Sequence, residues 1–170
     1  MSLAKKERIF AEAVTGLIIP SWMGTEWDFN GTTEEPGKGK IACGYFVTTV
    51  LRDAGVKLNR VKLAQCASSE MIRKLVAPKN IHSFYNGSFK ALYTFIAQNG
   101  YGLYIIGLDN HTGFIYNDGQ EIYFIHSSFV GPRCVQQEKV MDSWILKGSG
   151  CHILGEISGD ADVLNSWGFN

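Results

Sequence analysis

The sequence lacks a charge imbalance and any long apolar run. Its 16 basic residues offset 16 acidic ones, so no long-range field steers the chain toward nucleic acid or an anionic surface. No apolar stretch reaches the roughly 20 residues that a transmembrane helix requires. We therefore expect neither a nucleic-acid partner nor a membrane-spanning segment.

A secretory signal is also missing from residues 1–8, which are charged and carry no apolar core. The localisation is therefore open: the protein is periplasmic or secreted if a signal peptide has been removed. The sequence does not indicate an oligomeric state.

Cysteines are few and dispersed, at positions 43, 66, 134 and 151. They form no C-x-x-C pair and no Cys/His cluster at zinc spacing, so we expect no structural metal. The Gly-rich segment 31–40 lacks the G-K-[ST] ending of a phosphate loop, and no cofactor is expected. A disulfide between Cys134 and Cys151 is left open, because a domain of this size does not need one.

The residues that are present suit one globular core. The chain is 45% hydrophobic and 19% charged, and its 170 residues suffice for one domain and are short for two. Apolar periodicity predicts a single α+β domain over residues 1–170, with a helical first half and a strand-rich second half. We expect helices over 4–17, from 43, and over 64–76, 88–98 and 138–146. We expect strands over 101–108, 111–116, 121–128 and 152–157, with a tight turn at 117–120.

Cys43 stands at the predicted start of an amphipathic helix, directly after the Gly-rich loop. Free N–H groups and a partial positive charge at a helix N-terminus favour a thiolate and can bind an oxyanion. Cys43 is therefore a candidate nucleophile, expected to form an ion pair with a nearby histidine. Taken alone, a cysteine inside a helix is more often an inert apolar residue.

His111 and His126 lie on either side of the predicted hairpin turn. We expect the two residues to lie opposite each other, or nearly so, on one face of the sheet, where their rings can share a hydrogen bond. One imidazole would then act as a base while the other fixes its tautomer. His82, in a predicted loop, and His152, at the start of the last strand, are expected to be structural or exposed.

These three motifs together resemble the NlpC family of papain-like cell-wall peptidases. That family has a cysteine at a helix start, then a strand beginning His-x-Gly, then a polar residue on the following strand. The matching segments here are Ala-Cys-Gly-Tyr-Phe-Val at 42–47, His-Thr-Gly-Phe at 111–114 and Phe-Ile-His-Ser-Ser at 124–128. The resemblance covers about residues 16–130.

The resemblance implies a papain-like fold, with helices packed on a mainly antiparallel sheet and the nucleophile at a helix N-terminus. It implies that Cys43, His111 and His126 form a catalytic triad that hydrolyses an amide bond through an acyl-enzyme. The expected substrate is a peptide or peptidoglycan fragment, in particular a peptidoglycan stem peptide.

Four residues near the cysteine in sequence are candidate substrate contacts. Trp22, Trp27 and Tyr45 could form aromatic walls of a cleft and Asp28 a polar contact, although core packing is the commoner role of a tryptophan. Two other functions stay open. The protein could be a thiol acyltransferase on the same scaffold, or a binding module that has lost activity.

Overall fold

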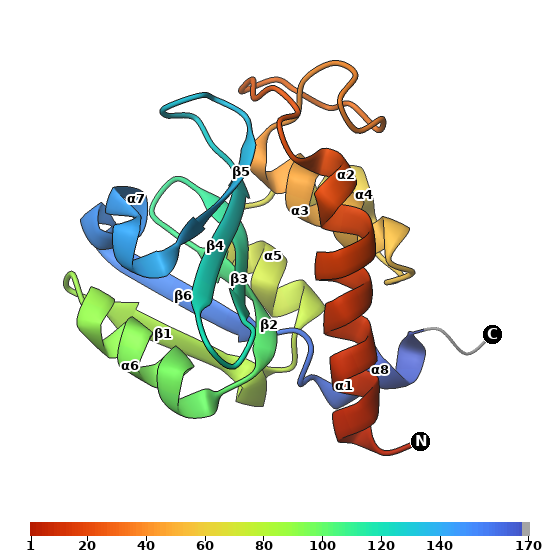
Figure 1. Ribbon diagram of the computed structural model, residues 1–170, viewed down its shortest axis with the longest axis vertical. Helices are drawn as coiled ribbons and strands as arrows, with labels where there is room; N and C mark the ends of the chain where they lie inside the picture. The colour runs from red at the N-terminus through yellow and green to blue at the C-terminus, as the bar shows by residue number, and fades with distance from the viewer. Residues whose placement is uncertain (168–170) are drawn as a thin grey trace.

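A six-stranded antiparallel sheet lies at the centre of the computed structural model, which describes residues 1–167 (Figure 1). The strand order is β1-β6-β2-β3-β4-β5, so the last strand lies between the first two. The sheet is open, and the expected α+β class is confirmed. The strands are β1 (Ile81–Tyr85), β2 (Gly102–Gly107), β3 (Thr112–Asn117), β4 (Ile122–Ser127), β5 (Val135–Lys139) and β6 (Cys151–Glu156).

Helices cover both faces of this sheet, which explains why β2 is buried along its whole length. Side chains alternate between the faces: Leu103 and Ile105 join one apolar cluster, and Tyr104 and Ile106 join the other. The first face carries α1 (Leu3–Glu12), α3 (Cys43–Asp53) and α5 (Ser68–Leu75), and the second carries α6 (Phe89–Asn99) and α7 (Trp144–Gly148). Two short helices, α4 (Arg60–Ala64) and α8 (Ala161–Ser166), pack beside α3 and α1.

The first helix continues beyond the predicted end at residue 17. A π-helical turn, Ala13–Ile18, joins α1 to α2 (Ile19–Trp22). Within it, the N–H of Ile19 donates to the carbonyl of Val14, five residues back. Pro20 has no N–H to donate to the preceding turn, and the wider turn accommodates this loss without ending the helix.

Two expected assignments after residue 75 were wrong. The predicted helix over 138–146 is strand β5, a 3-10 turn and then α7, which begins only after Ser143 caps its first turn. Strand β1 was missed, so His82 lies in an edge strand and not in a loop. The predicted helix over 64–76 is α5, which begins only at Ser68, and the short α4 before it was missed.

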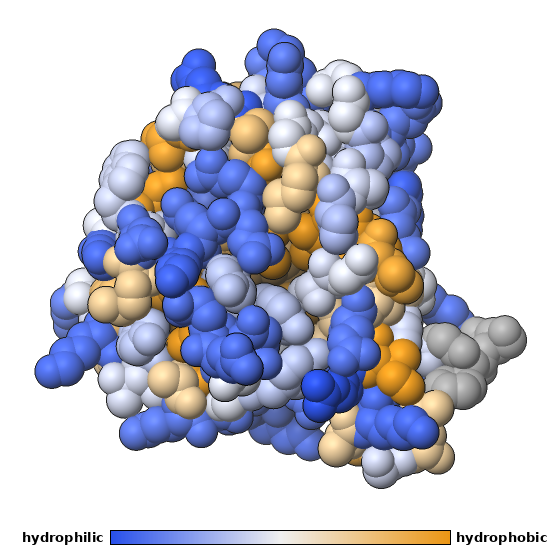
Figure 2. Space-filling model, viewed as in Figure 1, coloured by the Kyte–Doolittle hydropathy of each residue, from blue (hydrophilic) through white to orange (hydrophobic). Residues whose placement is uncertain are grey.

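The surface carries no continuous apolar face in the orientation of Figure 1. Figure 2 shows hydrophilic residues over most of this view, with apolar residues in separate groups between them. Single exposed apolar residues such as Leu17 and Phe29 are normal on protein surfaces. Among residues 1–167, no helix has both the length and the apolar character to cross a membrane.

Candidate active site

Cys43 is the first residue of α3, as predicted. Buried Phe46, Val47 and Val50 anchor this helix against the sheet. Ala42 precedes the helix with an extended backbone and has no side chain that could cap it. The N–H groups of Cys43 and Gly44 are therefore free to point at the Cys43 sulfur, with which they interact.

Hydrogen bonds fix the position of this helix start. The Ser127 hydroxyl donates to the carbonyl of Ile41 over 2.7 Å, and the N–H of Ala42 donates to the carbonyl of Gly31 over 2.9 Å. Ser127 follows His126 directly in β4. The strand that carries one candidate site residue is thus bonded to the segment that leads into Cys43.

His111 and His126 form a buried pair, as predicted. Nε2 of His111 lies 2.8 Å from Nδ1 of His126, and the rings meet at 80°. The register makes them diagonal neighbours and not direct partners. Phe114 lies opposite Ile125, so Gly113 comes beside His126 and His111 reaches it diagonally from the same face.

Gly113 makes this diagonal contact possible. A Cβ at this position would lie 2.8 Å from His126 Cβ and 2.7 Å from Phe124 Cε1. The Phe124 ring itself stacks on the His126 imidazole at 3.8 Å. The glycine of the His-x-Gly motif therefore leaves the space across which the two histidines meet.

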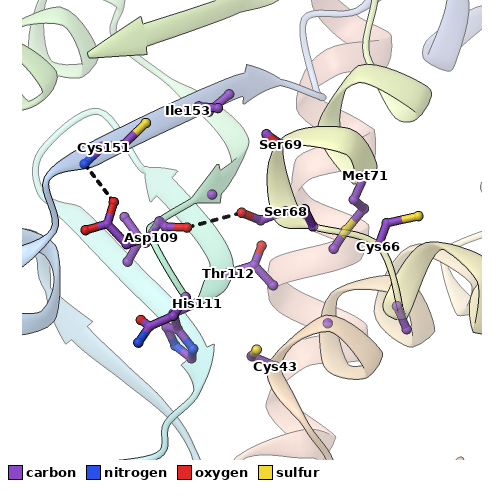
Figure 3. A pocket seen from close by; sticks show the side chains of 16 residues that line it. Cys43, Cys66, Ser68, Ser69, Met71, Asp109, His111, Thr112, Cys151 and Ile153 are labelled. Carbon is purple, nitrogen blue, oxygen red and sulfur yellow. Dashed lines mark hydrogen bonds between the residues drawn. The ribbon is translucent and has the colours of Figure 1, made fainter. Parts of the chain in front are cut away.

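Cys43 and His111 open into one pocket with a volume of about 410 Å³ (Figure 3). The backbone N–H of Thr112, the residue after His111, hydrogen-bonds the Cys43 sulfur. Figure 3 shows the Thr112 side chain above those of Cys43 and His111 in that view. Across the pocket, hydrogen bonds join its walls: the Ser68 hydroxyl donates to the Leu108 carbonyl, and the Asp109 carboxylate accepts from the N–H groups of Gly150 and Cys151.

Burial sets the protonation of the resting site. It raises the pKa of the Cys43 thiol, although hydrogen bonds from the N–H groups of Thr112, Gly44 and Cys43 act in the opposite direction. Burial, together with His126, lowers the pKa of His111 to about 3. The resting site therefore holds a thiol and a neutral imidazole, because desolvation outweighs the effect of the helix end. Both shifts favour this neutral pair over the ion pair expected from the sequence.

Glu138 is a site residue that the sequence analysis missed. Its Oε1 lies 3.4 Å from Nε2 of the buried His126, within ion-pair distance but without hydrogen-bond alignment. Burial acts to raise the pKa of Glu138, but contacts with His126 and the Ser143 hydroxyl outweigh it and lower the pKa. The carboxylate is thus ionised at neutral pH. Residues 135–139 read Val-Gln-Gln-Glu-Lys, a polar run without the alternation that is typical of a strand, so the sequence carried no local signal for the strand that bears Glu138.

Of the expected substrate contacts, Trp22 is corrected by the structure. It is fully buried and packs edge-on against Phe46, so it belongs to the core. Trp27 does not line the pocket. Its ring packs on Phe129, and the Phe129 ring in turn packs on His111 at 5.1 Å.

Asp28 and Tyr45 do not line the pocket either. The Asp28 carboxylate accepts from the N–H of Asn30, and the Arg60 guanidinium lies 4.9 Å above the Tyr45 ring. The pocket walls come instead from the start of α3, the end of α4, α5, β6 and the β2–β3 turn.

Within the described part of the chain, the remaining histidines and cysteines make no contact with the His111–His126 pair that would add to the site. His152 is buried and its Nε2 bonds to the Leu146 carbonyl at 2.6 Å. All four cysteines are free thiols, so Cys134 and Cys151 are not bridged. Among residues 1–167, no group of three or more His, Cys, Asp or Glu residues could hold a metal ion.

Comparisons with protein-family models, with curated proteins and with solved structures found no match to this chain. The function is therefore argued from the residues of the site and from their geometry.

Proposed function

We propose that the protein is a cysteine hydrolase of the NlpC type, which cleaves an amide bond in a peptide, with peptidoglycan stem peptides as the expected substrates. One observation carries the proposal: a buried His111–His126 hydrogen bond adjoins a pocket that also holds the helix-start thiol of Cys43. A thiol, a base and a group that orients the base are the parts that acyl transfer to cysteine requires.

The finer fold assignment is part of this proposal. The chain order of the parts supports a papain-like arrangement: a cysteine helix comes first, a strand preceded by histidine follows, and the next strand carries a polar orienting residue. The cysteine helix packs on the sheet against β3 and β4; His111 directly precedes β3, and His126 lies near the end of β4.

The chemistry follows from the neutral resting pair. As the Cys43 sulfur attacks the substrate carbonyl carbon, His111 accepts the thiol proton, and the carbonyl oxygen takes up negative charge. The N–H group of Cys43 at the uncapped helix end stabilises that oxyanion. His111 then gives its proton to the departing amine as the carbon–nitrogen bond breaks, which leaves an acyl-Cys43.

Hydrolysis repeats these steps with water. His111 takes a proton from water as its oxygen attacks the acyl carbon, and the carbon–sulfur bond breaks to release the acid and restore the thiol. In both half-reactions His111 is transiently positive. His126 stabilises this positive charge through its hydrogen bond to His111, and the ionised Glu138 stabilises it from beyond His126.

Digestion of purified muropeptides, followed by mass spectrometry, tests the proposal. The wild type should release an amine-bearing product, Cys43→Ala should release none, and His111→Ala should be slower by roughly 10²–10⁴-fold. Cys66→Ser is the matched control, because Cys66 lines the same pocket without approaching the histidines.

Equal products from the wild type and Cys43→Ala would overturn the proposal. Transfer of the acyl group to an added amine, in preference to water, would instead identify the acyltransferase alternative.

A further inference from the structure

The hydrogen bond between His111 and His126 can be drawn in two ways. One proton lies between Nε2 of His111 and Nδ1 of His126, and either nitrogen can carry it. If His126 donates, a neutral His111 must carry its own proton on Nδ1 and has no lone pair left there. If His111 donates, its Nδ1 is free to accept a proton.

The second nitrogen of His126 distinguishes these two states. Nε2 of His126 is buried, and Oε1 of Glu138 lies 3.4 Å from it. An ionised carboxylate only accepts hydrogen bonds, so it favours a proton on Nε2 of His126. A neutral His126 with that proton has a lone pair on Nδ1 and must accept from His111.

The fold holds Glu138 in place for this contact. Glu138 lies opposite Phe124 in the β4–β5 register, while Gln136 lies opposite His126, so Glu138 reaches His126 on the diagonal. The hydroxyl of Ser143, the N-cap of α7, also hydrogen-bonds the Glu138 carboxylate. Glu138 is half-buried, whereas its strand neighbours Gln137 and Lys139 are exposed.

The geometry points to Glu138 as a positioning residue: through His126, its carboxylate fixes the tautomer in which His111 presents an unprotonated Nδ1. The importance of this tautomer for catalysis rests on the proposed function, since only a reacting Cys43 requires the lone pair on Nδ1 of His111. The tautomers of the two histidines do not depend on the proposed function. Glu138 itself touches neither the pocket nor the thiol.

Long-range ¹H–¹⁵N NMR of the histidine rings tests the inference directly at pH 7. In the wild type, His111 and His126 should both be neutral with the proton on Nε2. Glu138→Ala should shift His126 toward the Nδ1–H form, and Glu138→Gln should restore the wild-type pattern because its amide oxygen can accept. The matched control Gln136→Ala, on the same strand, should leave both rings unchanged.

Alkylation of Cys43 by iodoacetamide gives the second readout. Glu138→Ala should lower its rate about tenfold or more, because general-base assistance contributes roughly 10²–10⁴-fold, and Glu138→Gln should recover most of it. A wild-type His126 that carries its proton on Nδ1 would overturn the inference, whether or not any variant folds. Wild-type tautomers in Glu138→Ala would overturn it as well.

The failure of the proposed function would look different. His111→Ala would then leave the alkylation rate of Cys43 unchanged, while the wild-type ring signals would still show both protons on Nε2.

Discussion

Replacement of Gly113 by alanine should separate the two histidines. The added methyl group would lie 2.7 Å from Phe124 Cε1, and 2.8 Å from both His126 Cβ and the Ile125 carbonyl oxygen. The last two atoms belong to or adjoin the β4 backbone, which is hydrogen-bonded to β3 on one side and β5 on the other. They cannot rotate away, so β3 and β4 must move apart at this point.

The expected cost lies at the upper end of the range for overpacking, about 3 kcal/mol. For a chain of this length, that corresponds to a fall in Tm of about 6–12 °C. The alkylation rate of Cys43 should fall as well, because the diagonal contact between His111 and His126 lies beside the methyl group.

Thermal unfolding by circular dichroism and alkylation of Cys43 followed by intact mass measure the two effects. Gly16→Ala is the control, since a Cβ there would meet no atom within 4 Å. A Gly113→Ala protein with the Tm and the alkylation rate of the wild type would refute the account of this motif.

Three further predictions concern stability. Because burial lowers the pKa of His111 to about 3 and also lowers that of His126, the unfolded chain binds more protons below its histidine pKa near 6.5. Stability should therefore fall with pH below about 6.5, by about 1–2 kcal/mol per histidine between pH 7 and 5, in urea unfolding, and a flat profile would contradict this. Asp160→Ala should cost about 3 kcal/mol in the same assay, because this buried carboxylate caps α8 and accepts from Ala77; a loss below about 0.5 kcal/mol would count against that role. Trp22→Phe should lower Tm and leave the alkylation rate of Cys43 unaltered, whereas a changed rate would mean that Trp22 does shape the site.

Local sequence patterns were sufficient for much of the fold. The period of apolar residues predicted α1, α3 and α6, and the turn residues at 117–120 predicted the hairpin of β3 and β4. The sequence also predicted that Cys43 begins a helix and that His111 lies beside His126. Both features depend on short segments of the chain.

Features that depend on distant contacts were not predictable in this way. Strand β5 reads as a polar segment and is a strand because it pairs with β4, so Glu138 was assigned to a helix. The pKa of Cys43 depends on how far the surrounding chain buries the thiol, and burial raises the pKa by more than the N–H groups at the helix end lower it. Trp22 is in the core because α2 carries it inward beyond the π-helical turn.

The strand order has a consequence for how the protein is made. β6, which comes last in sequence among the strands, fills the gap between β1 and β2 and supplies Cys151 and Ile153 to the pocket wall. During synthesis, β1 and β2 therefore emerge long before the strand that joins them, and such distant pairings form slowly. The nascent chain carries Cys43 and both histidines without a finished pocket, and the pocket wall is completed only when residues 151–156 have left the ribosome.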